Sequence, residues 1–122
     1  MDIIPILKID DILILTIQTE LYDKIAVELQ GNILEKIYAN RARGLIIDIT
    51  AIDIVDSFLG RILSDTAIMA KIMGVETVLV GVRSEIAITL QELGLELKGI
   101  HTALDLEKGI DFLKNIINEK DP

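Results

Sequence analysis

Hydrophobic residues along this chain alternate between short β-branched runs and longer stretches with helical spacing. Two short apolar runs, 3–9 and 12–17, flank Asp10-Asp11, a pattern that predicts two antiparallel strands joined by a tight acidic turn. Apolar residues then recur every four positions, which predicts a helix over about 21–39 whose apolar face is formed by Leu21, Ile25, Leu29, Ile33 and Ile37. We expect Arg43-Gly44 to close this helix before a fully covered strand at 45–49.

The second half of the chain continues this alternation. Residues 59–73 keep helical spacing until Gly74, with an expected inward face of Leu59, Ile62, Leu63, Thr66, Met69, Ala70 and Met73. A strand is predicted at 78–80, and Ser84 is expected to cap a helix that ends at Gly94 and turns Ile86, Leu90 and Leu93 inward. A short strand at 100–103 precedes an amphipathic helix with Leu106, Ile110, Leu113 and Ile117 on one face, and 118–122 is expected to fray.

The predicted element order is therefore β β α β α β α β α. This order favours an α/β fold with a mixed sheet of about five strands and about four helices packed against it. The length of 122 residues suits one domain, so we expect a single domain over 1–122.

Composition and charge exclude several classes of function. Only 3% of residues are aromatic and the net charge is −8, which argues against a base-stacking or phosphate-binding surface for nucleic acid. The basic residues Lys36, Arg41 and Arg43 fit a solvated helix end. The chain has no cysteine, which excludes disulfides, thiolate catalysis and cysteine-ligated metals. No signal peptide or membrane-spanning run is recognised, so we expect a cytoplasmic protein without membrane contact.

The segment 52–61 carries the candidate chemistry, because it leaves a buried strand, exposes a hydroxyl between acids and then begins a helix. Ser57 is the candidate switch residue, since helix N-terminal N–H groups can hold either a capping oxygen or a phosphate. An ordinary N-cap role for Ser57 stays open, although Gly60 leaves no capping box. We expect partner contacts around it from Asp53, Ile54, Val55, Asp56 and Phe58.

Other candidate chemistry has simpler interpretations. Asp48, Asp53 and Asp56 could converge on magnesium, as in a phosphoaspartyl receiver, or be ordinary loop acids. The stretch 80–84 has the generic form of an anion cradle but lacks both phosphate-binding fingerprints, which favours a tight turn. The single histidine, His101, lies in a predicted strand near the other end of the chain, so a surface or strand-end role is favoured over a catalytic base or metal ligand. We expect no catalytic residue, cofactor or metal ion.

The element order and the segment Val55-Asp56-Ser57-Phe58-Leu59-Gly60-Arg61 together resemble STAS domains, the family of bacterial anti-sigma factor antagonists, over essentially the whole chain. The resemblance implies a STAS-like mixed sheet and identifies Ser57 as the residue that a cognate serine kinase phosphorylates, with Asp56 as the preceding acid. The commoner antagonist motif follows Asp-Ser with a small residue and glycine, whereas here Phe58 and Leu59 delay the glycine to Gly60.

This departure makes the chain look more like the short RsbS-type scaffolds of the stressosome. That resemblance implies a non-enzymatic regulator that sequesters an RsbT-type serine/threonine switch kinase and releases it when Ser57 is phosphorylated. Implied partners are the kinase, RsbR-type STAS paralogues and further copies of the chain, in a homodimer and a larger assembly. The alternatives are a simple anti-sigma factor antagonist and, in another class, an aspartate-phosphorylated receiver or small α/β enzyme using Asp48, Asp53 and Asp56.

Overall fold

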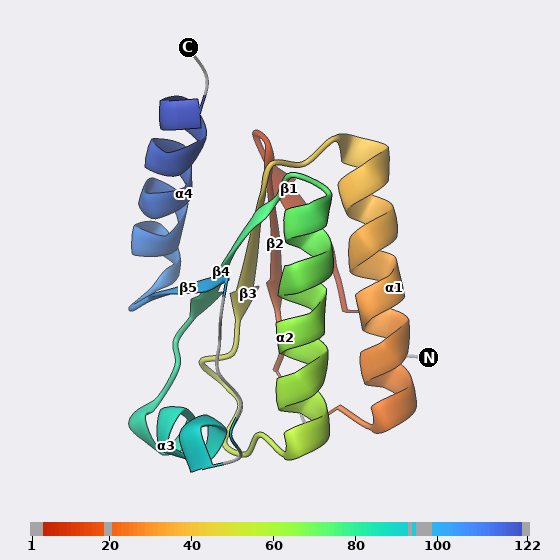
Figure 1. Ribbon diagram of the computed structural model, residues 1–122, viewed down its shortest axis with the longest axis vertical. Helices are drawn as coiled ribbons and strands as arrows, with labels where there is room; N and C mark the ends of the chain where they lie inside the picture. The colour runs from red at the N-terminus through yellow and green to blue at the C-terminus, as the bar shows by residue number, and fades with distance from the viewer. Residues whose placement is uncertain (1–3, 19–20, 93, 95–98, 121–122) are drawn as a thin grey trace.

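A computed structural model describes residues 4–18, 21–92, 94 and 99–120 of the chain. One sheet separates two helical layers (Figure 1): α1 and α2 lie together on one face, and α4 lies alone on the other. The elements in chain order are β1 (Ile6–Ile9), β2 (Ile12–Thr16), α1 (Asp23–Asn40), β3 (Gly44–Asp48), α2 (Ser57–Ile72), β4 (Glu76–Val80), α3 (Ser84–Glu92), β5 (Ile100–Ala103) and α4 (Leu106–Lys120). The predicted α/β class and mixed sheet are confirmed.

The five strands lie in the sheet in the same order as in the chain, β1-β2-β3-β4-β5. The first two strands form the predicted antiparallel hairpin, with Ile9 opposite Ile12 and Asp10 at a positive φ of 53° in the turn. All later pairings are parallel, so the carboxyl ends of β3 and β4 lie at one edge of the sheet, where the loops to α2 and α3 begin.

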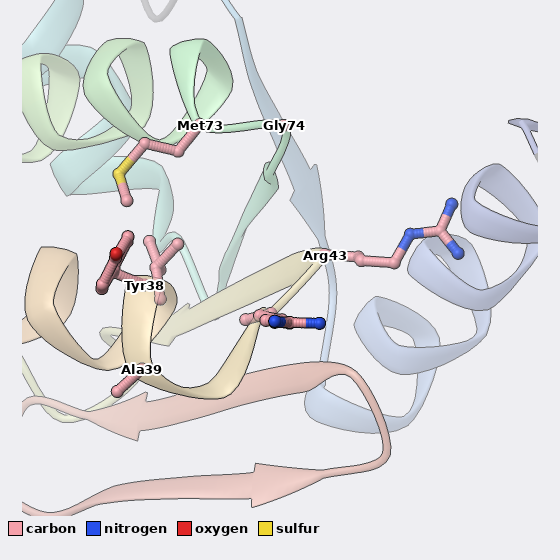
Figure 2. A pocket seen from close by; sticks show the side chains of 8 residues that line it. Tyr38, Ala39, Arg43, Met73 and Gly74 are labelled. Atoms are coloured by element: carbon pink, nitrogen blue, oxygen red, sulfur yellow. The ribbon is translucent and has the colours of Figure 1, made fainter.

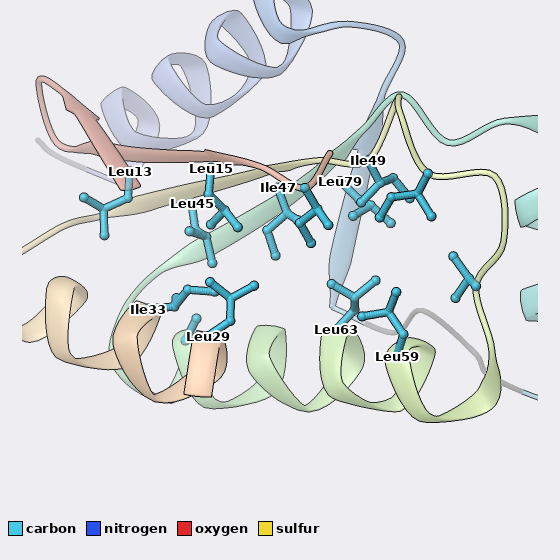
Figure 3. Packing of buried hydrophobic residues seen from close by; sticks show 14 of the residues in the cluster. Leu13, Leu15, Leu29, Ile33, Leu45, Ile47, Ile49, Leu59, Leu63 and Leu79 are labelled. Atoms are coloured by element: carbon cyan, nitrogen blue, oxygen red, sulfur yellow. The ribbon is translucent and has the colours of Figure 1, made fainter. Parts of the chain in front are cut away.

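The three central strands are apolar on both faces because helices cover both sides of the sheet. Odd-numbered strand residues face α1 and α2 and form most of the main core (Figure 3), which includes Leu13, Leu15, Leu29, Ile33, Leu45, Ile47, Leu63 and Leu79. Even-numbered strand residues face α4 and form a second, smaller core of Ile12, Ile14, Ile46, Val78, Val80 and Leu113. The expectation of a strand buried on both faces at 45–49 is thus met by β3.

Among the described helices, α4 is the one that covers the second core, and it lies close to the sheet. Leu113 of α4 is fully buried against the sheet. A Cβ atom added at Gly109 would lie 3.0 Å from Cγ2 of Val80, which is tighter than ordinary van der Waals contact. The missing side chain at Gly109 therefore lets the first turns of α4 approach β4.

Several boundaries differ from the sequence predictions. Helix α1 ends at Asn40 with Arg41 as a left-handed cap, so Arg43-Gly44 does not close it and Gly44 instead begins β3. Helix α4 continues to Lys120, so residues 118–120 are helical, while 121–122 lie outside the described residues. Strand β1 begins at Ile6, and the predicted start at residue 3 also lies outside them.

The inward faces of α2 and α4 were only partly predicted, since Leu106 of α4 is 38% exposed. On α2, Leu59, Leu63, Thr66 and Ala70 are buried, but Met69 and Met73 are each 40% exposed. The neighbouring helix α1 covers one flank of α2 and leaves these methionines at the surface. On α3, Ile86 and Leu90 are buried as predicted, whereas Leu93 lies outside the described residues.

Candidate phosphorylation and partner-binding site

Asp56, rather than Ser57, caps the N-terminus of α2. Its backbone is extended, with φ −87° and ψ 175°, and its carboxylate Oδ1 accepts a hydrogen bond from the Leu59 amide at 2.8 Å. Ser57 is consequently the first helical residue. The N-cap interpretation of Ser57 is wrong, because an aspartate in the preceding position already provides the capping oxygen.

The Ser57 side chain is exposed at this helix terminus. Within the described part of the chain, no side-chain hydrogen bond engages its hydroxyl. The amides of the first helical turn have no acceptor within the helix, and the positive end of the helix dipole lies here. The hydroxyl is therefore free to be modified where the backbone favours negative charge.

The apolar neighbours of Ser57 divide between the surface and the core. Ile54 is 64% exposed and Phe58 is half-buried, so both can contact a partner. Val55 is only 2% exposed and packs in the main core, so its predicted role in partner contact is corrected to one of anchoring the loop. Near Ser57 in the chain, Ile54, part of Phe58 and the acids Asp53 and Asp56 are thus exposed.

Asp53 joins the Ser57 loop to the loop that precedes α3. Its Oδ1 lies 2.7 Å from Nη1 of Arg83, and the two side chains are 75% and 48% exposed. Exposed ion pairs of this kind contribute about 0–1 kcal/mol, so the contact orients the loops more than it stabilises the fold. Sequence reasoning missed this pair, because 30 residues separate its members.

The same two loops also meet through Gly81, in the 80–84 stretch, and Thr50. Gly81 has a φ of +76°, and a Cβ atom there would overlap the Thr50 side chain and lie 2.9 Å from its Cα. Thr50 is in turn held by Asp48, whose Oδ1 accepts from the Thr50 amide at 2.9 Å and from its hydroxyl at 2.6 Å. The stretch forms a tight turn packed against the β3–α2 loop, and that packing accounts for its glycine.

The three acids considered for magnesium have separate partners. Asp48 binds Thr50, Asp53 pairs with Arg83 and Asp56 caps α2. In the ranges that the structure describes, no group of three or more histidine, aspartate or glutamate side chains is arranged to hold a metal ion. The geometry gives these carboxylates structural contacts in place of a shared centre.

His101 lies in β5 on the face that carries α4, whereas Ser57 begins a helix on the opposite face. Its Nε2 is 3.1 Å from Oε2 of the buried Glu76, and its ring centroid is 4.8 Å from that of Phe112. These contacts explain the histidine as part of the packing between β4, β5 and α4, consistent with a strand residue rather than a base acting on Ser57.

An open hollow lies at the far end of α2 from Ser57 (Figure 2), lined by Tyr38, Ala39, Arg43, Met73 and Gly74 among others. The Arg43 side chain points away from Tyr38 and Met73 in this view. Arg41 is exposed at the α1 cap, as expected for a basic residue at a solvated helix end. The hollow is therefore separate from the candidate site.

The chain matches one known protein family along most of its length. The family model described as the STAS domain matches residues 4–109. The chain belongs to the STAS domain family. Among solved structures, this STAS domain is similar to RsbS of Moorella thermoacetica, a serine-to-glutamate variant, with 40% identity, a TM-score of 0.85 and coverage of 94% of this chain and 97% of that one.

Two further similar proteins are a chain of the stressosome and an RsbT co-antagonist protein. One is a chain from the structure of the stressosome, described as a signal integration and transduction hub. It is 42% identical to this STAS domain with a TM-score of 0.82, and the match covers 93% of this chain and 98% of that one. The RsbT co-antagonist protein RsbRD of Bacillus subtilis is 32% identical over 87% of this chain and 38% of its own length. The STAS domain thus spans little more than a third of the curated relatives that it matches.

None of the helices in the described ranges is both long and apolar enough to span a lipid bilayer.

Proposed function

We propose that this STAS domain is a non-enzymatic scaffold and regulator of bacterial stress signalling that holds an RsbT-type serine/threonine kinase and releases it when Ser57 is phosphorylated. The proposal rests on one observation above all. Ser57 is exposed as the first residue of α2, and the neighbouring Asp56 already supplies the helix cap. Similarity to RsbS over nearly all of both chains supports the scaffold role.

The local charges explain how modification would act on binding. A phosphate adds about −1.5 to −2 charge beside Asp53 and Asp56. One like-charge contact at about 4 Å costs roughly 1–4 kcal/mol, whereas the helix dipole stabilises the phosphate by only about 0.3–1 kcal/mol. An acidic or apolar partner surface pressed against Ile54 and Phe58 therefore loses affinity, by tenfold for each ~1.4 kcal/mol.

Folding should tolerate the same phosphate. The hydroxyl carries no hydrogen bond within the described residues, and the Asp56 cap does not depend on it. The phosphate also remains in solvent, because Ser57 is exposed. We therefore expect the kinase to dissociate while the fold stays intact.

The proposed partners beyond the kinase are RsbR-type STAS paralogues and further copies of this chain. The supporting observation is the likeness to a chain of the stressosome and to two RsbT co-antagonist proteins. Light scattering with and without such a paralogue tests this point. A large complex supports the scaffold, whereas particles that stay small support a simple antagonist.

The kinase switch is tested by incubation with an RsbT-type kinase and ATP, followed by mapping of the modified residue by mass spectrometry. Ser57→Ala should keep the kinase bound, and Ser57→Asp should weaken binding by about tenfold if one charge costs ~1.4 kcal/mol. Ser84 provides a matched control, because it is an exposed serine that begins α3. Ser84→Asp should leave binding unchanged.

Two outcomes would contradict the proposal. Equal kinase affinity for the wild type, Ser57→Ala and Ser57→Asp rejects the switch. A hydroxylamine-labile phosphate on Asp48 or Asp53 supports a receiver-like protein instead.

A further inference from the structure

On the face of the sheet that carries α4, the described helices leave large apolar side chains of β1 exposed. Helix α4 packs over β3, β4 and β5, while β1 lies at the far edge of that face. Leu7 and Ile9 share this face, because they stand opposite Ile14 and Ile12 in the hairpin. They are 62% and 44% exposed, although Ile12 and Ile14 beside them are buried. Two large aliphatic side chains of an edge strand are thus open to solvent.

The backbone of β1 is also available for pairing. The amide of Ile17, just after β2, donates to the Asp48 carbonyl, which shows that odd-numbered residues of this segment point toward β3. Even-numbered residues of β2 therefore bond to β1, and they stand opposite Leu7 and Ile9. By alternation, the amides and carbonyls of Ile6 and Lys8 point to the outer edge.

Natural edge strands usually avoid association through proline, bulges or several charges. Strand β1 has an unbroken register and one charged residue, Lys8. Pro5 precedes the strand. Like Leu7 and Ile9, it is odd-numbered, so its backbone faces β2 and not the outer edge. This edge lacks most of the usual protection.

We propose that two copies of this chain pair antiparallel through β1, with a two-fold axis at Leu7, and so join their sheets into one. An antiparallel edge is self-complementary under such an axis. The proposal concerns self-association alone and does not require the Ser57 switch.

The sequence of β1 selects this register over its neighbours. An axis at Lys8 would place the two lysines directly opposite each other, which is unfavourable. An axis at Ile9 would place Leu7 opposite Asp11 of the second copy. An axis at Leu7 pairs Ile6 with Lys8 of the second copy, giving about four backbone hydrogen bonds. Pro5 then occupies a position where no N–H is needed.

Side chains on both faces fit this arrangement. On the α4 face, the two Leu7 side chains meet at the axis, and Ile9 of each copy lies diagonal to Leu7 of the other. On the α1 face, a hollow beside the edge is lined by Ile6, Asn32, Glu35 and Lys36 among others. Lys8 of the second copy stands opposite Ile6 and points to this face, because Lys8 pairs with Leu13. Its ammonium group can therefore approach the exposed Glu35, a complementary charge.

The absence of cysteine makes a direct test possible. Leu7→Cys places two thiols at a non-hydrogen-bonded pair, where Cα atoms are about 4.5 Å apart and a disulfide needs about 4.4–6.8 Å. Ile9→Cys is the matched control on the same face. The two cysteines at position 9 would be separated by four residues along the paired strands, about 13 Å, and should not cross-link. Efficient cross-linking of Ile9→Cys but not Leu7→Cys would overturn the register.

Sedimentation equilibrium without any kinase provides the second test. The wild type should be a dimer, and Lys8→Pro should raise the dimer Kd at least tenfold because it removes an outward N–H. Lys8→Ala keeps that N–H and should raise the Kd much less. The Lys8 amide does not bond to β2, so unchanged circular dichroism is expected for both variants. A monomeric wild type, or an unchanged Kd for Lys8→Pro, refutes pairing through β1 and leaves the kinase switch unaffected.

Discussion

The Asp56 carboxylate makes one hydrogen bond on which the start of α2 depends. Its Oδ1 accepts from the Leu59 amide at 2.8 Å. Replacing it with alanine leaves that amide without its cap, and the loss of an aspartate cap costs about 0.5–2 kcal/mol, typically about 1. For a chain of this size, 1 kcal/mol corresponds to a fall in Tm of roughly 3–6 °C. Asp56→Ala should therefore be destabilised by that amount.

Asp56→Asn separates the cap from the charge. The asparagine oxygen can accept the same bond, so only the interaction of the charge with the helix dipole is lost, about 0.3–1 kcal/mol at an exposed site. Urea unfolding followed by circular dichroism measures both variants. Asp65→Ala is the control, because Asp65 is an exposed acid in the same helix that makes no cap.

If Asp56→Ala is no less stable than Asp65→Ala, the Asp56 carboxylate does not stabilise the start of α2. The Asn variant also separates structure from recognition. If Asp56→Asn keeps its stability but is phosphorylated more slowly by the kinase, the carboxylate charge is part of what the kinase reads.

Three further substitutions test the packing. Gly81→Ala should be destabilised by about 2–5 kcal/mol in urea unfolding, since it adds left-handed strain of about 1–2 and a clash with Thr50 of about 1–3; a loss below 0.5 contradicts the close approach. Leu113→Ala should lower the free energy of unfolding by about 2–5 kcal/mol, because this fully buried side chain belongs to the core that α4 covers. An unchanged stability would show that neighbouring side chains refill the cavity. Thr77→Val should raise Tm, since Thr77 Oγ1 is buried without a hydrogen-bond partner in the described structure and an unpaired hydroxyl costs about 1–3 kcal/mol; a fall in Tm would reveal a partner.

The order of elements was predictable because the strands differ plainly from the helices in their apolar spacing. Continuous apolar runs mark β3 and β4, which are buried on both faces, and four-residue spacing marks α1. The termini of elements were less predictable. Asp56 and Ser57 are both good caps, so periodicity alone does not decide which one lies outside the helix.

Which loop residues face the core depends on contacts distant in sequence. Ile54 and Val55 are adjacent and chemically similar, yet one is 64% exposed and the other 2%. The pairing of Asp53 with Arg83 likewise requires β3 and β4 to be neighbours in a parallel sheet. The exposure of Ser57 at the start of α2 was predictable from the motif, whereas the contacts of the neighbouring loop residues follow from tertiary structure.

Because strand order repeats chain order, each strand can join its predecessor as it leaves the ribosome. Helix α4 is the last described element, and it packs over the second core. A nascent chain that has released β5 but still holds α4 in the exit tunnel would expose Ile46, Val78 and Val80. Chaperone binding is therefore expected mainly during this interval of synthesis, before α4 covers these residues.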